Sequence, residues 1–296
     1  MRTRNDNLAQ PVGAGWVPYA ELTKPRLVLL VLMTVVVSYL LAGRGRSVDW
    51  SGLVAAAVGT GLVGGGANGV NQVHEARLDA RMHRTRGRPI PSSRLKSPTA
   101  LLFALAISAA GLALLVWGAN LLTGLLGAVS WVAYVVAYTP MKRLTSLNTL
   151  VGAVPGAIPP LMGWAAASGR LEAGAFVLFA MVFIWQVPHF MAIAWLHRED
   201  YARAGFRMLP VEDPEGRVTF RVAVAYSLAL IPVSLMALPT GLGGGLYAWG
   251  AVIGGGAMLG LSVSLARRGT EGAARRLFVG SIVYMPAVFG LLLLGL

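Results

Sequence analysis

The 296-residue chain contains no cysteine and little charge, with Asp, Glu, Lys and Arg together making up 12% of it. The absence of cysteine excludes disulfides, thiolate metal sites, a catalytic thiol and covalent attachment of a c-type haem. A soluble domain carries about 25% charged residues, so this chain falls far short of what a water-exposed fold needs. Together with 56% hydrophobic residues and a mean hydropathy of +0.65, this excludes an ordinary soluble globule and predicts an integral membrane protein.

Apolar runs of about 20 residues follow one another along the chain. They cover residues 26–43, 52–73, 98–117, 119–138, 148–168, 172–196, 218–239, 243–265 and 277–296. None alternates as a β-barrel strand does, and a helix satisfies its own backbone hydrogen bonds in hydrocarbon. The sequence therefore predicts an all-α polytopic membrane protein, a single domain over 1–296 with nine transmembrane helices.

The basic residues indicate how the chain is oriented. The net charge of +13 comes from 25 Lys and Arg against 12 Asp and Glu, and only Arg44, Arg46 and Arg170 fall on the side opposite the N-terminus. The positive-inside rule then predicts a cytoplasmic N-terminal segment (1–25) and a C-terminus outside. Orientation and attraction to anionic lipid account for the charge excess, so no nucleic-acid partner is needed.

The first 25 residues favour a bacterial inner membrane. They include Asp6 and Glu21 and lead directly into an apolar run, without the pattern of a cleavable signal. The 37 glycines include three Gly-Gly-Gly triplets within or beside apolar runs. Because a phosphate-cradling loop would need a preceding strand, we interpret these triplets as seams where helices pack closely.

Two predicted cytoplasmic loops, 74–97 and 197–217, hold most of the acidic residues. Asn71, Glu75 and Asp79 lead into the first loop at intervals of four, so they share one face if the helix continues. Two carboxylates and an amide suit a hard cation such as Mg²⁺, which completes its shell with water and phosphate. A solvated helix end with ordinary ion pairs would show the same spacing, and the pattern alone leaves both interpretations open.

Basic and aromatic residues lie close to these acids. Arg84 and Arg88 follow them in the first loop, where guanidinium groups suit bidentate binding of phosphate oxygens. Tyr138, Lys142 and Arg143 stand at the end of the fourth run, where they supply a hydroxyl and two charges. An interfacial tyrosine and a snorkelling lysine would give the same pattern.

The second loop repeats the first in outline, with Asp200 followed by basic residues and an apolar-Pro pair. This predicts a weak internal duplication of a four-helix unit, in which two facing acidic loops hold metal on either side of a diphosphate. His189 lies inside the sixth run, and on a continuous helix it would face the same side as Asp200. An ionisable group inside the membrane is a functional candidate, although a histidine bonded to a neighbouring helix is the alternative.

These residues form an ordered set of motifs along nearly the whole chain. In chain order they are Leu22-Thr23-Lys24-Pro25-Arg26, Asn71-x3-Glu75-x3-Asp79, Arg84-Thr85-Arg86-Gly87-Arg88-Pro89, Tyr138-Thr139-Pro140-Met141-Lys142-Arg143, Gly156-Ala157-Ile158-Pro159-Pro160-Leu161-Met162-Gly163-Trp164, Pro188-His189-Phe190, Asp200-Tyr201 and Met208-Leu209-Pro210. The set resembles the UbiA-type intramembrane prenyltransferases, and Pro188-His189-Phe190 favours the branch that farnesylates protoheme IX to make haem O.

The resemblance implies that Asn71, Glu75, Asp79 and Asp200 bind Mg²⁺ and prenyl diphosphate, with Tyr138 and Lys142 as a diphosphate element. The sequence departs from the usual family motifs at two positions. Glu75 takes the place of the usual Asp, and Leu196 stands where the second motif usually has its first Asp. For that second metal position, Glu199 and His197 are alternative ligands.

The implied reaction transfers farnesyl from farnesyl diphosphate to the vinyl group of haem b with addition of water. Its products are haem O, for respiratory oxidases, and diphosphate. We expect His189 to contact the haem or to orient that water, and a haem A synthase or an oxidase assembly factor is an expected partner. The alternatives are prenylation of an aromatic quinone precursor and transport of an amphiphilic anion. A transporter would place its charged sites at mid-membrane.

Overall fold

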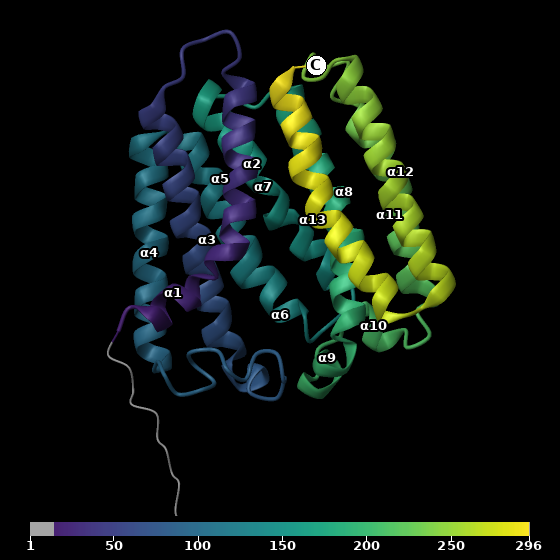
Figure 1. Cartoon of the computed structure of the whole chain (residues 1–296). Coiled ribbons are helices and arrows are strands. Elements are labelled where there is room, and N and C mark those ends of the chain that lie inside the picture. The colour runs from purple at the N-terminus through teal and green to yellow at the C-terminus, as the bar shows by residue number, and fades with distance from the viewer. Residues whose placement is uncertain (1–14, 296) are drawn as a thin grey trace, which may run out of the picture.

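The computed structural model describes residues 15–295, which form a helical bundle without strands (Figure 1). Nine stretches of these residues are helical, long and apolar enough to cross a membrane. They are α2 (Pro25–Ala42), α3 (Trp50–Asp79), α4 (Ser97–Gly118), α5 (Leu121–Val132) with its extension to Met141, α7 (Asn148–Ser168), α8 (Ala173–Leu196), α11 (Arg217–Leu235), α12 (Gly245–Arg268) and α13 (Glu271–Leu294). The predicted fold class is confirmed.

Three short helices lie at one end of the bundle: α1 (Val17–Thr23), α9 (Arg198–Ala204) and α10 (Leu209–Glu212). The prediction for residues 1–25 lies largely outside the described residues, and so does the last residue of the ninth predicted span. The described part of this N-terminal segment packs against the bundle. Leu22 of α1 is fully buried, and its carbonyl accepts a hydrogen bond from Gln72 Nε2 of α3 at 2.7 Å.

The helices enclose a buried core along the bundle axis. α2 packs on α7, α3 on α4, and α8 contacts α7, α11 and α13. Pro159 in α7 has no amide hydrogen to donate to the carbonyl of Pro155, and Ser130 of α5 donates to that carbonyl instead at 3.1 Å. A neighbouring hydroxyl thus satisfies a backbone group that proline leaves free in an apolar environment.

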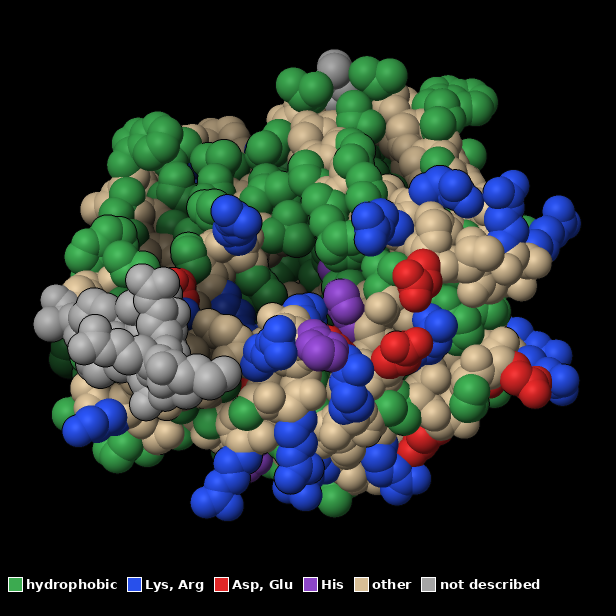
Figure 2. Space-filling view, turned by 60° about the horizontal axis from the view of Figure 1, so that its bottom comes forward, with side chains coloured by type: hydrophobic (Ala, Val, Ile, Leu, Met, Phe, Trp, Pro, Cys, Tyr) green, Lys and Arg blue, Asp and Glu red, His purple; other side chains and the backbone are tan. Residues whose placement is uncertain are grey.

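The loops 80–96, 142–147 and 197–216 lie together at the end of the bundle that carries α1, which we call the loop end (Figure 1). Viewed toward this end, Lys and Arg side chains crowd the loop surface, while the helix flanks are hydrophobic (Figure 2). Arg44 lies at the opposite end, where its guanidinium donates to the backbone carbonyls of Leu242 and Leu292. It joins the connection before α12 to the end of α13. The internal duplication stays a prediction.

Two helix boundaries decide where the site residues lie. α3 continues to Asp79, past the predicted end of its apolar run at residue 73. α8 instead ends at Leu196, and α9 starts afresh at Arg198 after His197 leaves helical geometry. The relation expected between His189 and Asp200 on one continuous helix is therefore wrong, because the helix is interrupted between them.

Candidate active site

A polar cavity of about 170 Å³ lies at the loop end, between α2, α3, the π-helical segment η1 (Ala133–Tyr138) and the two long loops. The residues that line it are Lys24, Leu27, Asn71, Glu75, Asp79, Met82, Arg84, Arg88, Tyr134, Tyr138, Lys142, Tyr201, Phe206 and Met208. Seven of the predicted site residues therefore meet in one cavity, although the chain supplies them from three separate segments.

The acidic face of α3 is as predicted. Asn71, Glu75 and Asp79 are all buried, and Asp79 is 0% exposed. Asn71 Nδ2 donates to the hydroxyl of Thr139 at 3.2 Å, which turns the amide toward the end of η1. Burial of all three side chains excludes the alternative of a solvated helix end.

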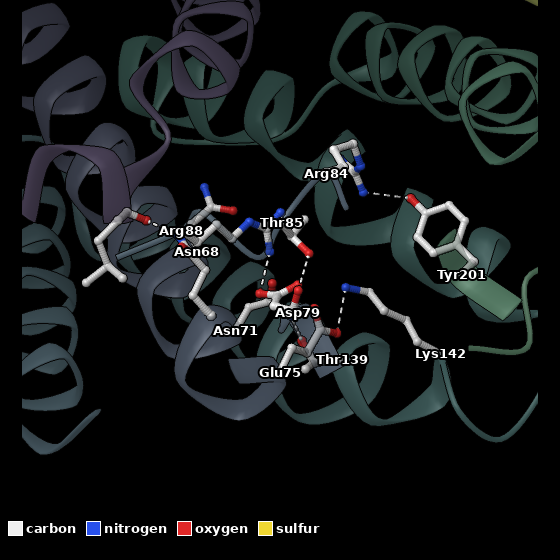
Figure 3. Close-up of polar contacts among 12 residues, drawn as sticks. Asn68, Asn71, Glu75, Asp79, Arg84, Thr85, Arg88, Thr139, Lys142 and Tyr201 are labelled. Carbon is white, nitrogen blue, oxygen red and sulfur yellow. Dashed lines mark hydrogen bonds and ion pairs between the residues drawn. The ribbon is translucent and has the colours of Figure 1, made fainter. Parts of the chain in front are cut away.

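Each carboxylate holds one basic partner across the cavity (Figure 3). Lys142 Nζ lies 2.8 Å from Glu75 Oε1, and Arg88 Nη1 lies 2.6 Å from Asp79 Oδ2. Burial alone would lower the pKa of Lys142, but the Glu75 carboxylate together with Tyr134 and Tyr201 outweighs burial and raises it, so the ammonium stays charged. Such pairs keep the buried charges compensated.

Lys24 lines the same cavity, and the sequence reasoning assigned it no role. Its backbone adopts the left-handed region (φ 52°) between α1 and α2, and Asn68 Nδ2 donates to the preceding carbonyl of Thr23 at 3.4 Å. Burial, with repulsion from Arg88 and Lys142, lowers the pKa of Lys24 to about 7. The sequence feature that could have pointed to Lys24 is the Lys24-Pro25 pair at the start of the first apolar run.

The π-helical segment η1 brings two tyrosines to the cavity. Tyr134 and Tyr138 lie beside each other on this segment, with ring centroids 5.4 Å apart, and Lys142 Nζ lies 4.6 Å from the Tyr138 ring centre. Short π-helical turns occur frequently at functional sites. Tyr138 was predicted as a site residue and Tyr134 was not, although a spacing of four residues places both on one helical face.

Three predicted site residues lie elsewhere. Arg143 is exposed on the chain that follows α6 (Thr139–Met141) and does not line the cavity. Asp200 is buried outside this cavity, at a separate pocket, where its carboxylate accepts hydrogen bonds from the backbone amides of His83 and Arg84. Its predicted role as a metal ligand stays a prediction, which this placement does not favour.

His189 lines a second, apolar cavity of about 220 Å³ between α2, η1, α7, α8 and α13. Its ring stacks on Trp185 with centroids 5.0 Å apart, and Nδ1 lies 2.7 Å from the hydroxyl oxygen of Ser281. That hydroxyl donates to the carbonyl of Phe278 at 2.6 Å, so Nδ1 is the donor in the neutral imidazole. Nε2 then keeps its lone pair.

A third cavity, also apolar, lies between α2, α3, α5, η1 and α7, and Trp131, Gly64 and Met162 are among its lining residues. Leu27 and Tyr134 line all three cavities. One polar compartment at the loop end therefore meets two apolar compartments within the bundle.

The acidic face fits a hard cation. Asp79 Oδ1 is buried and has no hydrogen-bond partner among residues 15–295, so an unused carboxylate oxygen remains beside Glu75 and Asn71. No cluster of three His, Cys, Asp or Glu residues occurs in this part of the chain, which argues against an all-protein metal cage. Mg²⁺ fits because it takes few protein oxygens and retains water and phosphate ligands.

The sequence model of the UbiA prenyltransferase family matches residues 31–289. The chain belongs to this family. It is 45% identical over 284 residues to a protein of Solibacter usitatus named protoheme IX farnesyltransferase, with 93% of this chain and 97% of that protein covered. A Myxococcus xanthus protein of the same name is 42% identical over 275 residues, with 93% and 92% covered.

Solved structures share the UbiA-family fold at low sequence identity. A digeranylgeranylglyceryl phosphate synthase superposes with a TM-score of 0.78 at 15% identity, covering 94% of this chain and 97% of that one. A UbiA homologue from Archaeoglobus fulgidus bound to GPP and Mg²⁺ superposes with a TM-score of 0.69 at 12% identity, covering 93% and 99%. With its apolar helices, this UbiA-family chain is a multi-pass membrane protein.

Proposed function

We propose that this prenyltransferase transfers the farnesyl group of farnesyl diphosphate to the vinyl group of haem b, with addition of water, to give haem O and diphosphate. The observation that carries the proposal is one polar cavity that meets two apolar cavities. Four basic residues (Lys24, Arg84, Arg88, Lys142) face two carboxylates in the polar cavity, and this excess suits a diphosphate. The names of the relatives support the choice of farnesyl and haem.

The polar cavity would bind and stabilise the leaving group. Asn71, Glu75 and Asp79 would hold Mg²⁺, which, when bound, supplies charge that stabilises the departing diphosphate. Lys142 and Arg88 already lie within hydrogen-bond distance of the carboxylates, and they would turn to phosphate oxygens as the ligands enter. Ionisation of the allylic C–O bond needs no protein nucleophile, so the task of these residues is electrostatic.

The two apolar cavities suit the two apolar groups that must meet. We assign the cavity with Gly64 and Trp131 to the farnesyl chain, because its lining holds no ionisable side chain apart from Tyr134 at the junction. The cavity with His189 and Trp185 would take the porphyrin edge, with Nε2 of His189 free for the haem or for the water. Apolar walls would protect the farnesyl cation from premature hydrolysis.

We further propose a bacterial inner membrane with the loop end in the cytoplasm. The distribution of basic residues supports this orientation, and it is visible as the crowding of Lys and Arg at the loop end (Figure 2). An anion transporter with charged sites at mid-membrane is not favoured, because the buried acids of the cavity lie where α3 reaches the loop end.

The function is tested by incubating purified protein with Mg²⁺, farnesyl diphosphate and haem b. We expect a hydroxyfarnesylated haem, detected by chromatography and mass spectrometry. The control replaces haem b with an aromatic quinone precursor. Product from the aromatic acceptor and none from haem would overturn the proposal.

Lys24→Arg is expected to remove part of the pH dependence of diphosphate binding. A bound anion favours the charged ammonium, so binding to Lys24 requires proton uptake above its free pKa of about 7, and affinity falls as pH rises. Arginine stays charged throughout. Between about pH 6 and about pH 8, wild-type affinity should fall about tenfold more than that of the variant. Calorimetry with inorganic diphosphate measures this, and parallel pH profiles would contradict it.

His189→Ala is expected to weaken haem b binding about tenfold, because a fixed imidazole nitrogen and a stacked ring are both lost. Titration of the Soret band in detergent measures the change. His74→Ala serves as the matched control, since His74 is exposed on α3. If haem binding and turnover are unchanged in His189→Ala, the role proposed for His189 is wrong.

A further inference from the structure

The two long loops are joined through the carboxylate of Asp200. Oδ1 accepts a hydrogen bond from the backbone amide of His83 at 3.1 Å, and Oδ2 accepts one from the amide of Arg84 at 3.2 Å. Arg203 on α9 also pairs with Oδ1. Burial alone would raise the pKa of Asp200, but these hydrogen bonds outweigh it and lower the pKa, so the group is ionised at neutral pH.

An apolar cluster beneath this contact holds the same two loops together. Met82 of the first loop is 2% exposed and packs with Phe206 and Met208, which follow α9, and with Ala204 at its end. The hydroxyl of Thr85 donates to the carbonyl of Asp79 at 2.9 Å, so the first loop folds back tightly on the end of α3. The segment 82–85 is therefore held from two sides.

The segment held by Asp200 includes Arg84, whose side chain lines the polar cavity. Arg84 Nη2 donates to the hydroxyl of Tyr201 at 3.3 Å, and the guanidinium carbon lies 5.7 Å from the centre of that ring (Figure 3). Arg84 and Tyr201 both line the polar cavity, whereas Asp200 does not. The second loop thus fixes Arg84 at its backbone through Asp200 and at its guanidinium through Tyr201.

We propose that Asp200 is a positioning residue that latches the first loop to the second, so that Arg84 is presented to the diphosphate. The inference rests on the proposed function for the identity of the anion. It differs from metal ligation, because two backbone amides and Arg203 already compensate the charge of this carboxylate without a cation. The two roles predict different results for one substitution.

The test compares Asp200→Asn with wild type in the full-length protein in detergent. We expect the dissociation constant for inorganic diphosphate to rise about tenfold, as one charge-assisted bond is lost and a side-chain amide meets a backbone amide. Hydrogen exchange in a peptide spanning 80–88 should become at least about tenfold faster, because its latch is lost. The Mg²⁺ concentration for half-maximal transfer should not change. Glu215→Gln, an exposed acid of the same loop, is the matched control.

Two results would overturn the latch. One is an unchanged rate of hydrogen exchange in the 80–88 peptide, whether or not the Mg²⁺ concentration for half-maximal transfer rises. The other is faster exchange with unchanged diphosphate affinity. Both measurements proceed without farnesyl diphosphate or haem, so failure of the haem assay leaves them interpretable. If Asp200→Asn does not fold, Asp200→Ser replaces it: the shorter hydroxyl cannot accept from both amides, so faster exchange in the 80–88 peptide and weaker diphosphate affinity are again expected, and unchanged exchange overturns the proposal.

Discussion

Asp79→Asn is expected to lower the rate of farnesyl transfer at saturating substrates by a factor of about 10³. The substitution keeps the volume of the side chain and removes its charge. Asp79 is fully buried, one of its oxygens pairs with Arg88, and the other has no partner among the described residues. The variant would lose a metal ligand and would also leave Arg88 without its compensating carboxylate.

Steady-state kinetics across a range of Mg²⁺ concentrations measure this effect. The rate should fall and the Mg²⁺ concentration for half-maximal activity should rise, while helical content by circular dichroism stays the same. Glu215→Gln makes the same acid-to-amide change at an exposed side chain outside the cavity, and it should behave as wild type. An Asp79→Asn rate within tenfold of wild type would exclude the proposed metal site on α3.

Gly163→Ala is expected to destabilise the bundle by about 3 kcal/mol, at the upper end for an overpacked core. Gly163 lies where α7 crosses α2. A Cβ atom there would stand 2.2 Å from the backbone carbonyl oxygen of Val35 and 2.9 Å from its carbonyl carbon. Because backbone atoms cannot rotate away as a side chain can, the two helices must move apart.

Thermal unfolding in detergent measures the loss of stability. The matched control is Gly260→Ala in α12, where an added Cβ meets nothing within 4 Å. Since alanine favours helix over glycine by up to about 1 kcal/mol, the control should be as stable as wild type or slightly more stable. Equal midpoints for the two variants would show that the α2–α7 crossing tolerates a wider separation.

The sequence predicted the local parts of the site well. Asn71, Glu75 and Asp79 lie on one buried face because an interval of four residues depends only on helix geometry, and no residue in this stretch breaks the helix. Tyr138 and Lys142 reach the same cavity, as the motif resemblance implied. Arg143 follows them by one residue, and its different direction on the exposed surface could not be read from composition.

Residues whose position depends on distant contacts were harder to predict. Lys24 reaches the cavity because α1 packs on α3, and no local sequence pattern predicts this contact. Tyr134 lines the cavity where its segment meets α3, and its hydroxyl donates to Asn68 Oδ1 at 3.2 Å, a contact between residues far apart in the chain. Asp200 was expected to bind metal, yet the break after α8 and the approach of the first loop direct its carboxylate to the amides of His83 and Arg84.

Hydropathy, charge and helical spacing are local properties, so they were enough to predict the membrane environment, the all-α class, the run of nine spans and the acidic face. The packing of the helices was needed to show which cations compensate those acids, that one polar cavity meets two apolar ones, and that Asp200 contacts the first loop. These features depend on side chains far apart in the chain, and their distances are set by how the helices pack.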